Sequence, residues 1–385
     1  MLYLAQYGNN SSLAKAEVLS YVLTNRFSFV SEDTNYLIFN SETNVRPDFG
    51  SVLRVAKFFA YEHNLLSAIK EELCFTDRAI LWSIFPANIH GEDVKRIRHE
   101  IMSLLKVIRK KSIYVSPDQN YSDNGGVTVT KALRKLSHGG FELLVSKQAG
   151  ELTYWKVIKY IDLNGFRERD LQRPYQNSML SLPISLARTM VNLSCAKPGN
   201  TLLDPFCGTG TILIEAAESG ISVTGVDVDP IKVEGARRNL EWLFHIKKGS
   251  VFYVFKHDAR SVHEKFPSEF FDCVVTEPPF GPPLKSLPTL ALSQEIAYSL
   301  TALYRNFFLS VSKVLKVGGK VVVTMPLWRL QDGGSYSLPV KQLLKATSLS
   351  LDETLSGYGV SYPITWSKPD NKIQRQIFVL TKRAS

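Results

Sequence analysis

The sequence has few of the residues that build covalent or metal-bound frameworks. Its 385 residues include only four cysteines, and the spacing of Cys74, Cys195, Cys207 and Cys273 does not fit a metal site. We therefore expect reduced thiols and no bound metal, as is usual for cytoplasmic proteins. No apolar run is long enough to span a bilayer, and the residues after Met1 lack the basic flank of a signal peptide. The sequence thus predicts a cytoplasmic chain without a membrane span.

Acidic residues are also in the minority. Lys and Arg number 46 against 36 Asp and Glu, which gives a formal net charge of +10 at pH 7. A basic surface attracts polyanions such as nucleic acids. The net charge therefore favours a polyanionic partner. Because the excess is spread over both halves of the chain, it does not locate a binding surface, and a basic surface without a partner is the alternative.

One stretch in the middle of the chain has the order strand, glycine turn, helix. The apolar run Thr201–Leu203 ends in Asp204, and a helix starts at Thr211, just after Gly208 and Gly210. Such a unit binds nucleotide-like ligands in α/β proteins, because the glycines leave room for a ligand against the backbone. The third glycine of a dinucleotide-binding turn is absent, which argues against NAD.

Acidic side chains near this turn indicate the charge of its ligand. Asp204 would repel a diphosphate at the helix N-terminus but would attract the ammonium and sulfonium groups of S-adenosylmethionine (AdoMet). Asp227 follows the next strand, at the distance where ribose hydroxyls are usually bound. Asp258 follows a third strand and could accept a hydrogen bond from an adenine amino group. The predicted cofactor is AdoMet, with binding residues Asp204, Phe206, Gly208, Gly210, Asp227, Asp258 and Ala259.

A fourth acid precedes two prolines and an aromatic residue, in Glu277-Pro278-Pro279-Phe280. The exocyclic amine of a base is a poor nucleophile because its lone pair is delocalised into the ring. A carboxylate and the Pro278 carbonyl can accept its two N–H groups and bend the nitrogen towards tetrahedral geometry. The prolines stiffen the turn, and Phe280 can stack on a flipped-out base. We predict that these four residues are catalytic.

Strands and helices alternate in the second half of the chain. This alternation predicts a mostly parallel sheet that binds ligands at the carboxyl ends of its strands, where the four acids should meet. A long amphipathic helix that includes Ile296 and Val314 is expected to end at Gly318-Gly319. The strands are predicted over 201–203, 223–226, 251–255, 271–276, 320–325 and 376–381.

The first 162 residues contain no motif of chemical function. They include a predicted amphipathic helix from Gly91 to about Lys111 with a basic polar face, and a second basic helix over 130–137. RNA binding and a solvated face matched to the helix dipole both explain this pattern, so both interpretations stay open. The predicted RNA-binding residues are Lys95, Arg98, Arg109, Lys110, Lys111, Lys131, Arg134 and Lys135.

The motifs Asp204–Gly210 and Glu277–Gly281 together resemble the signature of the amino-methyltransferases. The segments Arg167–Pro174 and Leu186–Leu193 are similar to those of the THUMP-domain tRNA guanine-N2 methyltransferases. The resemblance implies methylation of a guanosine N2 amine, at position ten of tRNA, with the acceptor end of the tRNA held by the THUMP unit. It also implies, for eukaryotic members, a small zinc-binding activator subunit.

The resemblance further implies a division of the chain into domains. The C-terminal one is a Rossmann-like class I methyltransferase domain of α/β class. The implied parts are an N-terminal ferredoxin-like domain (1–55), a THUMP-like domain (56–162), a charged linker (163–180) and the methyltransferase domain (181–385).

One residue departs from the family pattern. Position 277 is Glu, where the family usually has Asp or Asn. The extra methylene moves the acceptor by about 1 Å, a displacement that costs about 100-fold in rate unless the backbone compensates. An RNA-binding protein with a weakly active or inactive methyltransferase domain therefore stays open. A DNA amino-methyltransferase also stays open because its motifs overlap with these, although the sequence shows no large target-recognition insertion.

Overall fold

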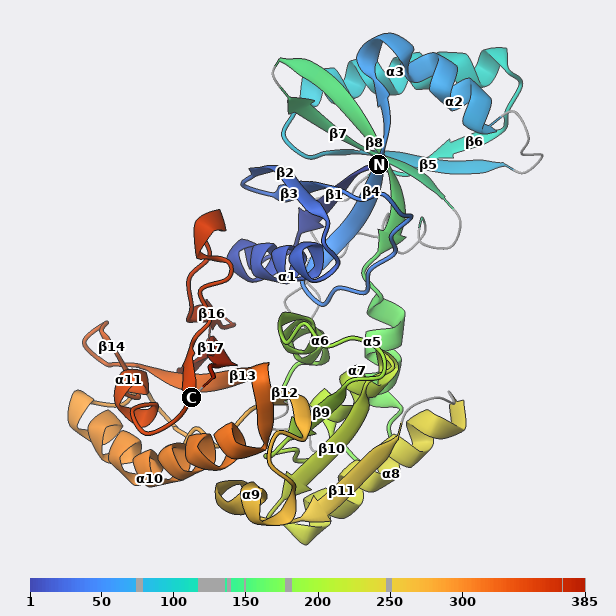
Figure 1. Ribbon diagram of the computed structural model, residues 1–385. Coiled ribbons are helices and arrows are strands. Elements are labelled where there is room, and N and C mark those ends of the chain that lie inside the picture. The colour runs from blue at the N-terminus through green and yellow to red at the C-terminus, as the bar shows by residue number, and fades with distance from the viewer. Residues whose placement is uncertain are drawn as a thin grey trace. The chain divides into compact units, whose positions relative to one another are not determined.

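The computed structural model describes residues 1–73, 79–116, 136, 140–148, 150–176, 182–246, 251–368 and 370–384 (Figure 1). By their internal contacts these residues divide into two compact units, Met1–Asp162 and Leu163–Ser385. Among the described residues no helix is both long and apolar enough to cross a membrane.

The first unit is built around one mixed sheet with the strand order β2-β3-β1-β4-β8-β7-β5-β6. Helices α2 and α3 cover one face, where Ile69, Ile97 and Ile101 are buried in the core around Trp82 and Tyr154. The strands are β1 (Leu2–Tyr7), β2 (Ser28–Asp33), β3 (Tyr36–Asn40), β4 (Val52–Tyr61), β5 (Ile80–Pro86), β6 (Ser112–Tyr114), β7 (Phe141–Gln148) and β8 (Glu151–Tyr160). The helices are α1 (Ser11–Thr24), α2 (Leu65–Leu73) and α3 (Gly91–Val107).

This sheet joins the two parts that the sequence assigns to separate domains. Strand β4 runs across the division at residues 55 and 56, and it pairs with β1 on one side and with β8 on the other. A buried ion pair between Arg54 and Glu142, 2.8 Å long, spans the same division. The structure therefore draws no boundary between 1–55 and 56–162, and the ferredoxin-like and THUMP-like assignments stay predictions.

Helix α3 is shorter than predicted. It ends at Val107 instead of near Lys111, and Arg109 has a positive φ of 54° in the turn that leads to β6. The basic residues Arg109–Lys111 therefore lie in a connection and not on a helix face. The predicted second basic helix, with Lys131, Arg134 and Lys135, lies outside the described residues.

The second unit contains the predicted parallel sheet. Its strand order is β11-β10-β9-β12-β13-β17-β15, and β14 and β16 pair with β13 and β17. Strands from β11 to β13 are parallel, whereas β17 is antiparallel to β13. The strands are β9 (Thr201–Asp204), β10 (Ser222–Asp227), β11 (Phe252–Lys256), β12 (Phe271–Thr276), β13 (Leu315–Arg329), β14 (Ser335–Ser337), β15 (Leu349–Leu351), β16 (Ile364–Trp366) and β17 (Ile373–Lys382).

Helices cover both faces of this sheet, with α6 and α7 on one side and α10 on the other (Figure 1). Tyr304, Phe307 and Phe308 of α10 are fully buried against Val321 and Val323 of β13. The helices are α5 (Leu163–Leu171), α6 (Ile184–Leu193), α7 (Thr211–Glu218), α8 (Pro230–Ile246), α9 (Val262–Lys265), α10 (Leu290–Val314) and α11 (Val340–Leu343). Helix α8 starts at Pro230, and the Asp229 carboxylate accepts a hydrogen bond from the Ile231 N–H.

The predicted charged linker is a packed element of this unit. Residues 163–171 form α5, and Arg169 is buried beside Glu215 of α7 at 2.6 Å. Glu215 is completely buried and also pairs with Arg188 of α6 at 2.8 Å. Arg169 thus ties α5 to α7 and, through Glu215, to α6, so this part of the predicted linker is packed against the unit.

The predicted end of the long helix is also wrong. Helix α10 ends at Val314, and β13 begins at Leu315. Gly318 and Gly319 lie within β13, where the pairing with β12 shifts from Leu315 to Lys320. The two glycines therefore mark an irregularity in a strand.

Candidate active site

The carboxyl ends of neighbouring strands bring acidic residues together. Asp204 ends β9, Asp227 ends β10, and Glu277 follows directly after β12. The charges of Asp227 and Glu277 both act on Asp204, which shows that the three carboxylates share one region. Asp258 stands two residues beyond the end of β11. The parallel sheet agrees with the sequence prediction, and three of the four acids predicted to meet are grouped at its edge, whereas nothing within the described residues groups Asp258 with them.

Asp204 is the most deeply buried of these acids, with 1% of its surface exposed. Its carboxylate accepts hydrogen bonds from the Thr276 hydroxyl at 2.6 Å and from the Phe206 N–H at 3.2 Å. Burial raises the pKa of Asp204 to about 7, and the nearby charges of Asp227 and Glu277 act in the same direction. A cation placed beside this carboxylate would stabilise its ionised form.

The glycine turn presents bare backbone next to these acids. The Asp227 carboxylate accepts hydrogen bonds from the N–H groups of Gly208, at 3.1 Å, and Asp229, at 2.9 Å. Gly208 has a φ of 51°, and a Cβ atom there would meet no other atom within 4 Å. Gly210 is the N-cap of α7. The turn therefore leaves open space in which a ligand can approach the main chain.

The other predicted cofactor contacts have partners within the protein. Asp258 accepts hydrogen bonds from the Arg260 N–H and guanidinium, and these hold the pKa of Asp258 below its usual value. Ala259 is buried in the core, with 2% of its surface exposed. The Phe206 ring packs edge-on against Phe307, with 5.3 Å between the ring centroids. Binding of adenine by Asp258 and Ala259 stays a prediction.

The Glu277 carboxylate is held by two residues that the sequence did not indicate. Its Oε2 atom accepts hydrogen bonds from the Thr324 hydroxyl at 3.0 Å and from Arg375 Nε at 2.7 Å. Its Oε1 atom accepts a hydrogen bond from Arg375 Nη2 at 3.0 Å. The arginine is 98 residues away along the chain, on β17, so no local pattern could connect it with Glu277.

The turn after Glu277 is fixed by α10. The hydroxyl of the buried Tyr304 donates a 3.1 Å hydrogen bond to the Pro279 carbonyl. Gly281 has a φ of 95°, and a Cβ atom there would lie 2.6 Å from Ile296 Cγ2, so only glycine fits. Phe280 is half-buried, and its ring centre is 5.6 Å from the guanidinium carbon of Arg375.

Cys207 lies inside the turn but is not suited to nucleophilic attack. It is buried, and burial raises the pKa of its thiol well above the usual value, so the thiol stays protonated. Across the described residues no group of three His, Cys, Asp or Glu side chains could hold a metal ion.

The predicted RNA-binding residues that the structure describes lie on α3 and in the connection after it. Lys95, Arg98, Arg109 and Lys111 are exposed, and Lys110 is half-buried. The Arg98 guanidinium lies over the Tyr114 ring, 4.1 Å from its centre.

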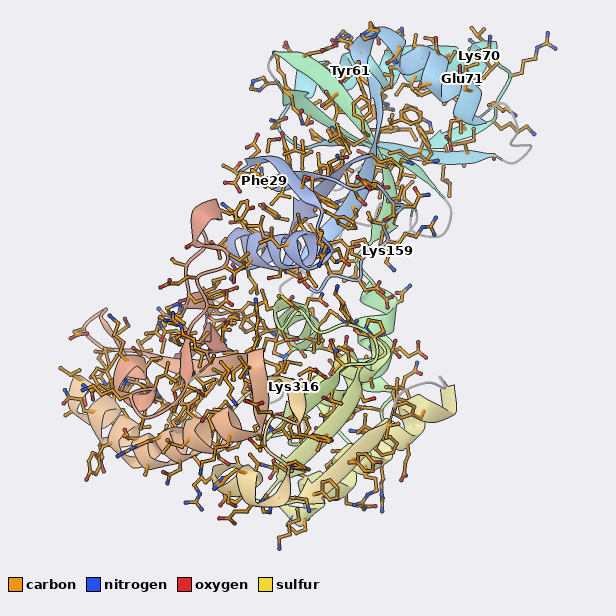
Figure 2. All side chains as sticks on the ribbon, in the orientation of Figure 1. Phe29, Tyr61, Lys70, Glu71, Lys159 and Lys316 are labelled. Atoms are coloured by element: carbon orange, nitrogen blue, oxygen red, sulfur yellow. The ribbon has the colours of Figure 1, made fainter. Side chains whose placement is uncertain are left out.

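Negative charges accompany these cations on the same side of the sheet. Lys70 and Glu71 project from the neighbouring α2 (Figure 2), and Arg96 of α3 pairs with Glu62 at 2.7 Å. Because acids are interspersed among the basic residues, exposure alone does not distinguish an RNA-binding face from a solvated one.

Residues 172–328 match the family model described as RMKL-like, methyltransferase domain. These residues form a methyltransferase domain. The range starts in the predicted linker and ends in β13, so it contains both the glycine turn and Glu277-Pro278-Pro279-Phe280. The predicted class I fold of this part of the chain is confirmed.

Known relatives match parts of this chain. The tRNA (guanine(10)-N2)-dimethyltransferase of Pyrococcus abyssi is 35% identical over 241 residues, 62% of this chain and 62% of the relative. The protein of the same name from Methanothermobacter thermautotrophicus is 41% identical over 146 residues, 38% of this chain and 39% of the relative. The chain thus spans between 39% and 62% of the length of these two relatives. They confirm the resemblance to the guanine-N2 methyltransferases.

A solved structure gives a weaker likeness. The alignment with the crystal structure of TrmN from Thermus thermophilus covers 99% of this chain and 100% of the TrmN chain. The sequence identity is 17% and the TM-score is 0.49. At that level it adds nothing to what the strand order of the methyltransferase domain already shows.

Proposed function

We propose that the protein transfers a methyl group from AdoMet to the exocyclic N2 amine of a guanosine in tRNA. The observation that carries the proposal is the position of Glu277, directly after β12 and next to the buried Asp204 of β9. Glu277, which can accept a hydrogen bond from an amine, thus lies beside Asp204, whose buried carboxylate favours a nearby cation. The names of the relatives support guanosine ten as the target base.

The residues at the glycine turn fit AdoMet. Asp204 would face the positively charged part of the cofactor, because its buried carboxylate gains most from a nearby cation. Asp227 would accept hydrogen bonds from the ribose hydroxyls, and the open space at Gly208 would admit the cofactor against the backbone. When bound, AdoMet supplies a methyl group on a sulfonium, which passes to the amine nitrogen and leaves S-adenosylhomocysteine.

The turn after β12 would hold the guanine. Glu277 and the Pro278 carbonyl would accept hydrogen bonds from the two amine N–H groups, which directs the nitrogen lone pair away from the ring. Phe280 would stack on the flipped-out base. The methylated amine is acidic enough to release its proton to water, so the site needs no strong general base.

Transfer RNA would be bound through the exposed basic residues of the first unit. The THUMP-like assignment of that unit, the cytoplasmic location and a small activator subunit, as in eukaryotic members of the family, belong to the same proposal. Phosphate contacts would make the binding strongly dependent on salt.

The test is transfer of label from methyl-labelled AdoMet to unmodified tRNA by the purified protein. We expect label in the tRNA, and its loss from a transcript in which guanosine ten is replaced by adenosine. A protein that binds AdoMet in calorimetry but leaves the tRNA unlabelled would refute the proposal. Label in duplex DNA in place of tRNA would favour the DNA amino-methyltransferase.

A second candidate function is RNA binding with little or no turnover. The observation in its favour is that both oxygens of Glu277 already accept hydrogen bonds, from Arg375 and Thr324. Tight tRNA binding together with a lack of methyl transfer in the same assay would support this candidate.

A further inference from the structure

The sheet places three side chains from separate strands on one face. Thr276 of β12 pairs with Val323 of β13, so the next residues, Glu277 and Thr324, point to the opposite face from that pair. In the antiparallel pair of β13 and β17, Pro326 is the partner of Arg375. Because side chains alternate along a strand, Pro326 shares the face of Thr324, and Arg375 shares it too. The meeting of these side chains is thus set by strand register.

The contact between Arg375 and Glu277 is a two-pronged ion pair. Arg375 Nε and Nη2 approach different carboxylate oxygens, at 2.7 and 3.0 Å. The side chains are only 15% and 17% exposed, so water screens the pair less than it screens a surface salt bridge. A planar guanidinium in this geometry fixes the direction of the carboxylate as well as its distance.

Aromatic rings hold the arginine in turn. Its guanidinium carbon lies 5.6 Å from the centre of the Phe280 ring and 5.5 Å from the centre of the Trp366 ring. Trp366 stands opposite Arg375 in the pairing of β16 with β17. A cation at this distance from a ring is attracted to it. The arginine is therefore held by one anion and two rings.

We infer that Arg375 is a positioning residue for the Glu277 carboxylate in the proposed methyl transfer. Glutamate has one more rotatable bond than aspartate, so a free glutamate carboxylate would occupy several positions. Three hydrogen bonds from Arg375 and Thr324 select one of them.

The fixed carboxylate still has room for a substrate. Each carboxylate oxygen has two lone pairs, and within the described residues Oε1 receives only the bond from Nη2. Oε1 is therefore the atom that would accept the amine N–H.

This inference rests on the proposed function and extends it to a residue outside the matched domain. The family match ends at residue 328, whereas Trp366 and Arg375 lie on β16 and β17. The antiparallel strand thus supplies the contact that makes glutamate usable where the family usually has Asp or Asn. An aspartate at position 277 has one rotatable bond fewer and would not need the arginine to fix its carboxylate. The effect of removing Arg375 should therefore depend on whether residue 277 is Glu or Asp, and this dependence provides the test.

The experiment is a double-mutant cycle on wild type, Arg375→Ala, Glu277→Asp and the double variant. For each protein kcat and KM for the tRNA are measured in the labelling assay, and the Kd of AdoMet by calorimetry. We expect each single change to lower kcat by about tenfold or more, since both misplace the acceptor. The double variant should be no worse than the slower single variant, because the arginine acts through the carboxylate. The Kd of AdoMet should stay within about twofold throughout.

Two further variants separate positioning from folding. Arg375→Lys keeps the positive charge but lacks the planar guanidinium that binds both carboxylate oxygens. Its kcat should therefore lie between the values for Arg375→Ala and wild type. Arg305→Ala, at an exposed position of α10, is the matched control and should leave kcat unchanged. Thermal unfolding of every variant shows whether a loss of kcat reflects loss of the fold. If Arg375→Ala is unfolded, the kcat of the folded Arg375→Lys variant tests the positioning role in its place.

Each outcome decides for or against the inference. Multiplying losses in the double variant, or an unchanged or higher kcat in Arg375→Ala, would overturn the positioning role while the proposed function stands. A wild type that transfers no label would refute the proposed function and this inference with it.

Discussion

The Thr276 hydroxyl donates a 2.6 Å hydrogen bond to the carboxylate of Asp204. These residues end the adjacent parallel strands β12 and β9, so the bond joins the glycine turn to the turn that carries Glu277. The proposed cofactor site and the proposed base site are therefore coupled through one buried contact.

Asp204 should make the stability of the protein depend on pH. Burial raises its pKa to about 7, against 3.8 for an ordinary aspartate. Between these values the unfolded chain has lost a proton that the folded chain keeps, so unfolding becomes more favourable as pH rises. We expect the free energy of unfolding to fall from about pH 4 to about pH 7 and then to level off, and Asp204→Asn to flatten this fall. Urea unfolding at several pH values measures both proteins, and equal slopes would contradict the expectation.

Glu215 should be essential for the stability of the second unit. Its carboxylate is completely buried between Arg169 and Arg188, at 2.6 and 2.8 Å. Glu215→Gln removes the negative charge that faces two buried arginines. The variant should therefore lower the free energy of unfolding by about 3–5 kcal/mol. The control Glu241→Gln, at an exposed position of α8, should change that free energy by less than about 0.5 kcal/mol. Equal denaturation curves for the two variants would show that the cluster contributes little.

Phe280 should act on the base and not on the cofactor. Stacking of a base on an aromatic ring contributes about 1–3 kcal/mol, so Phe280→Ala should lower kcat/KM for tRNA by about 5- to 160-fold. The Kd of AdoMet should be unchanged, and Phe280→Tyr, which keeps the ring, should retain most of the activity. Equal losses of turnover and of AdoMet affinity in Phe280→Ala would contradict a stacking role.

Charge reversal after α3 should weaken tRNA binding. Lys110→Glu/Lys111→Glu replaces the two lysines in the connection after α3 by acids. The loss of two phosphate contacts should reduce the slope of log affinity against log salt by roughly 2. The same change at Lys341 and Lys345, two exposed lysines of the second unit, is the matched control. Filter binding at several salt concentrations gives both slopes. Unchanged affinity at low salt would show that these two lysines are merely solvated.

The features that could be predicted from the sequence are those set by neighbouring residues. The glycine turn after β9 and the acids at the strand ends follow from short local patterns, and the structure places Asp204, Asp227 and Glu277 in one region. Strand β4 could not be predicted in the same way. Five consecutive residues from Val52 are buried, so the strand has no alternation to distinguish it from a helix.

Contacts between residues that are far apart along the chain could not be predicted from the sequence, for a different reason. Arg375 meets Glu277 only because β17 pairs antiparallel to β13, and nothing near either residue encodes that register. The local sequence places Arg169 in a charged linker, because its partner Glu215 lies 46 residues further along the chain. Gly318 and Gly319 indicated a helix end, whereas α10 ends at Val314 without a glycine.

The most direct test of the account is mass spectrometry of nucleosides from unmodified tRNA that was incubated with the protein and AdoMet. The account predicts N2-methylated guanosine in the treated tRNA and none in the tRNA treated with Asp204→Ala. The absence of methylated guanosine, from a protein shown to be folded and to bind AdoMet, would contradict it.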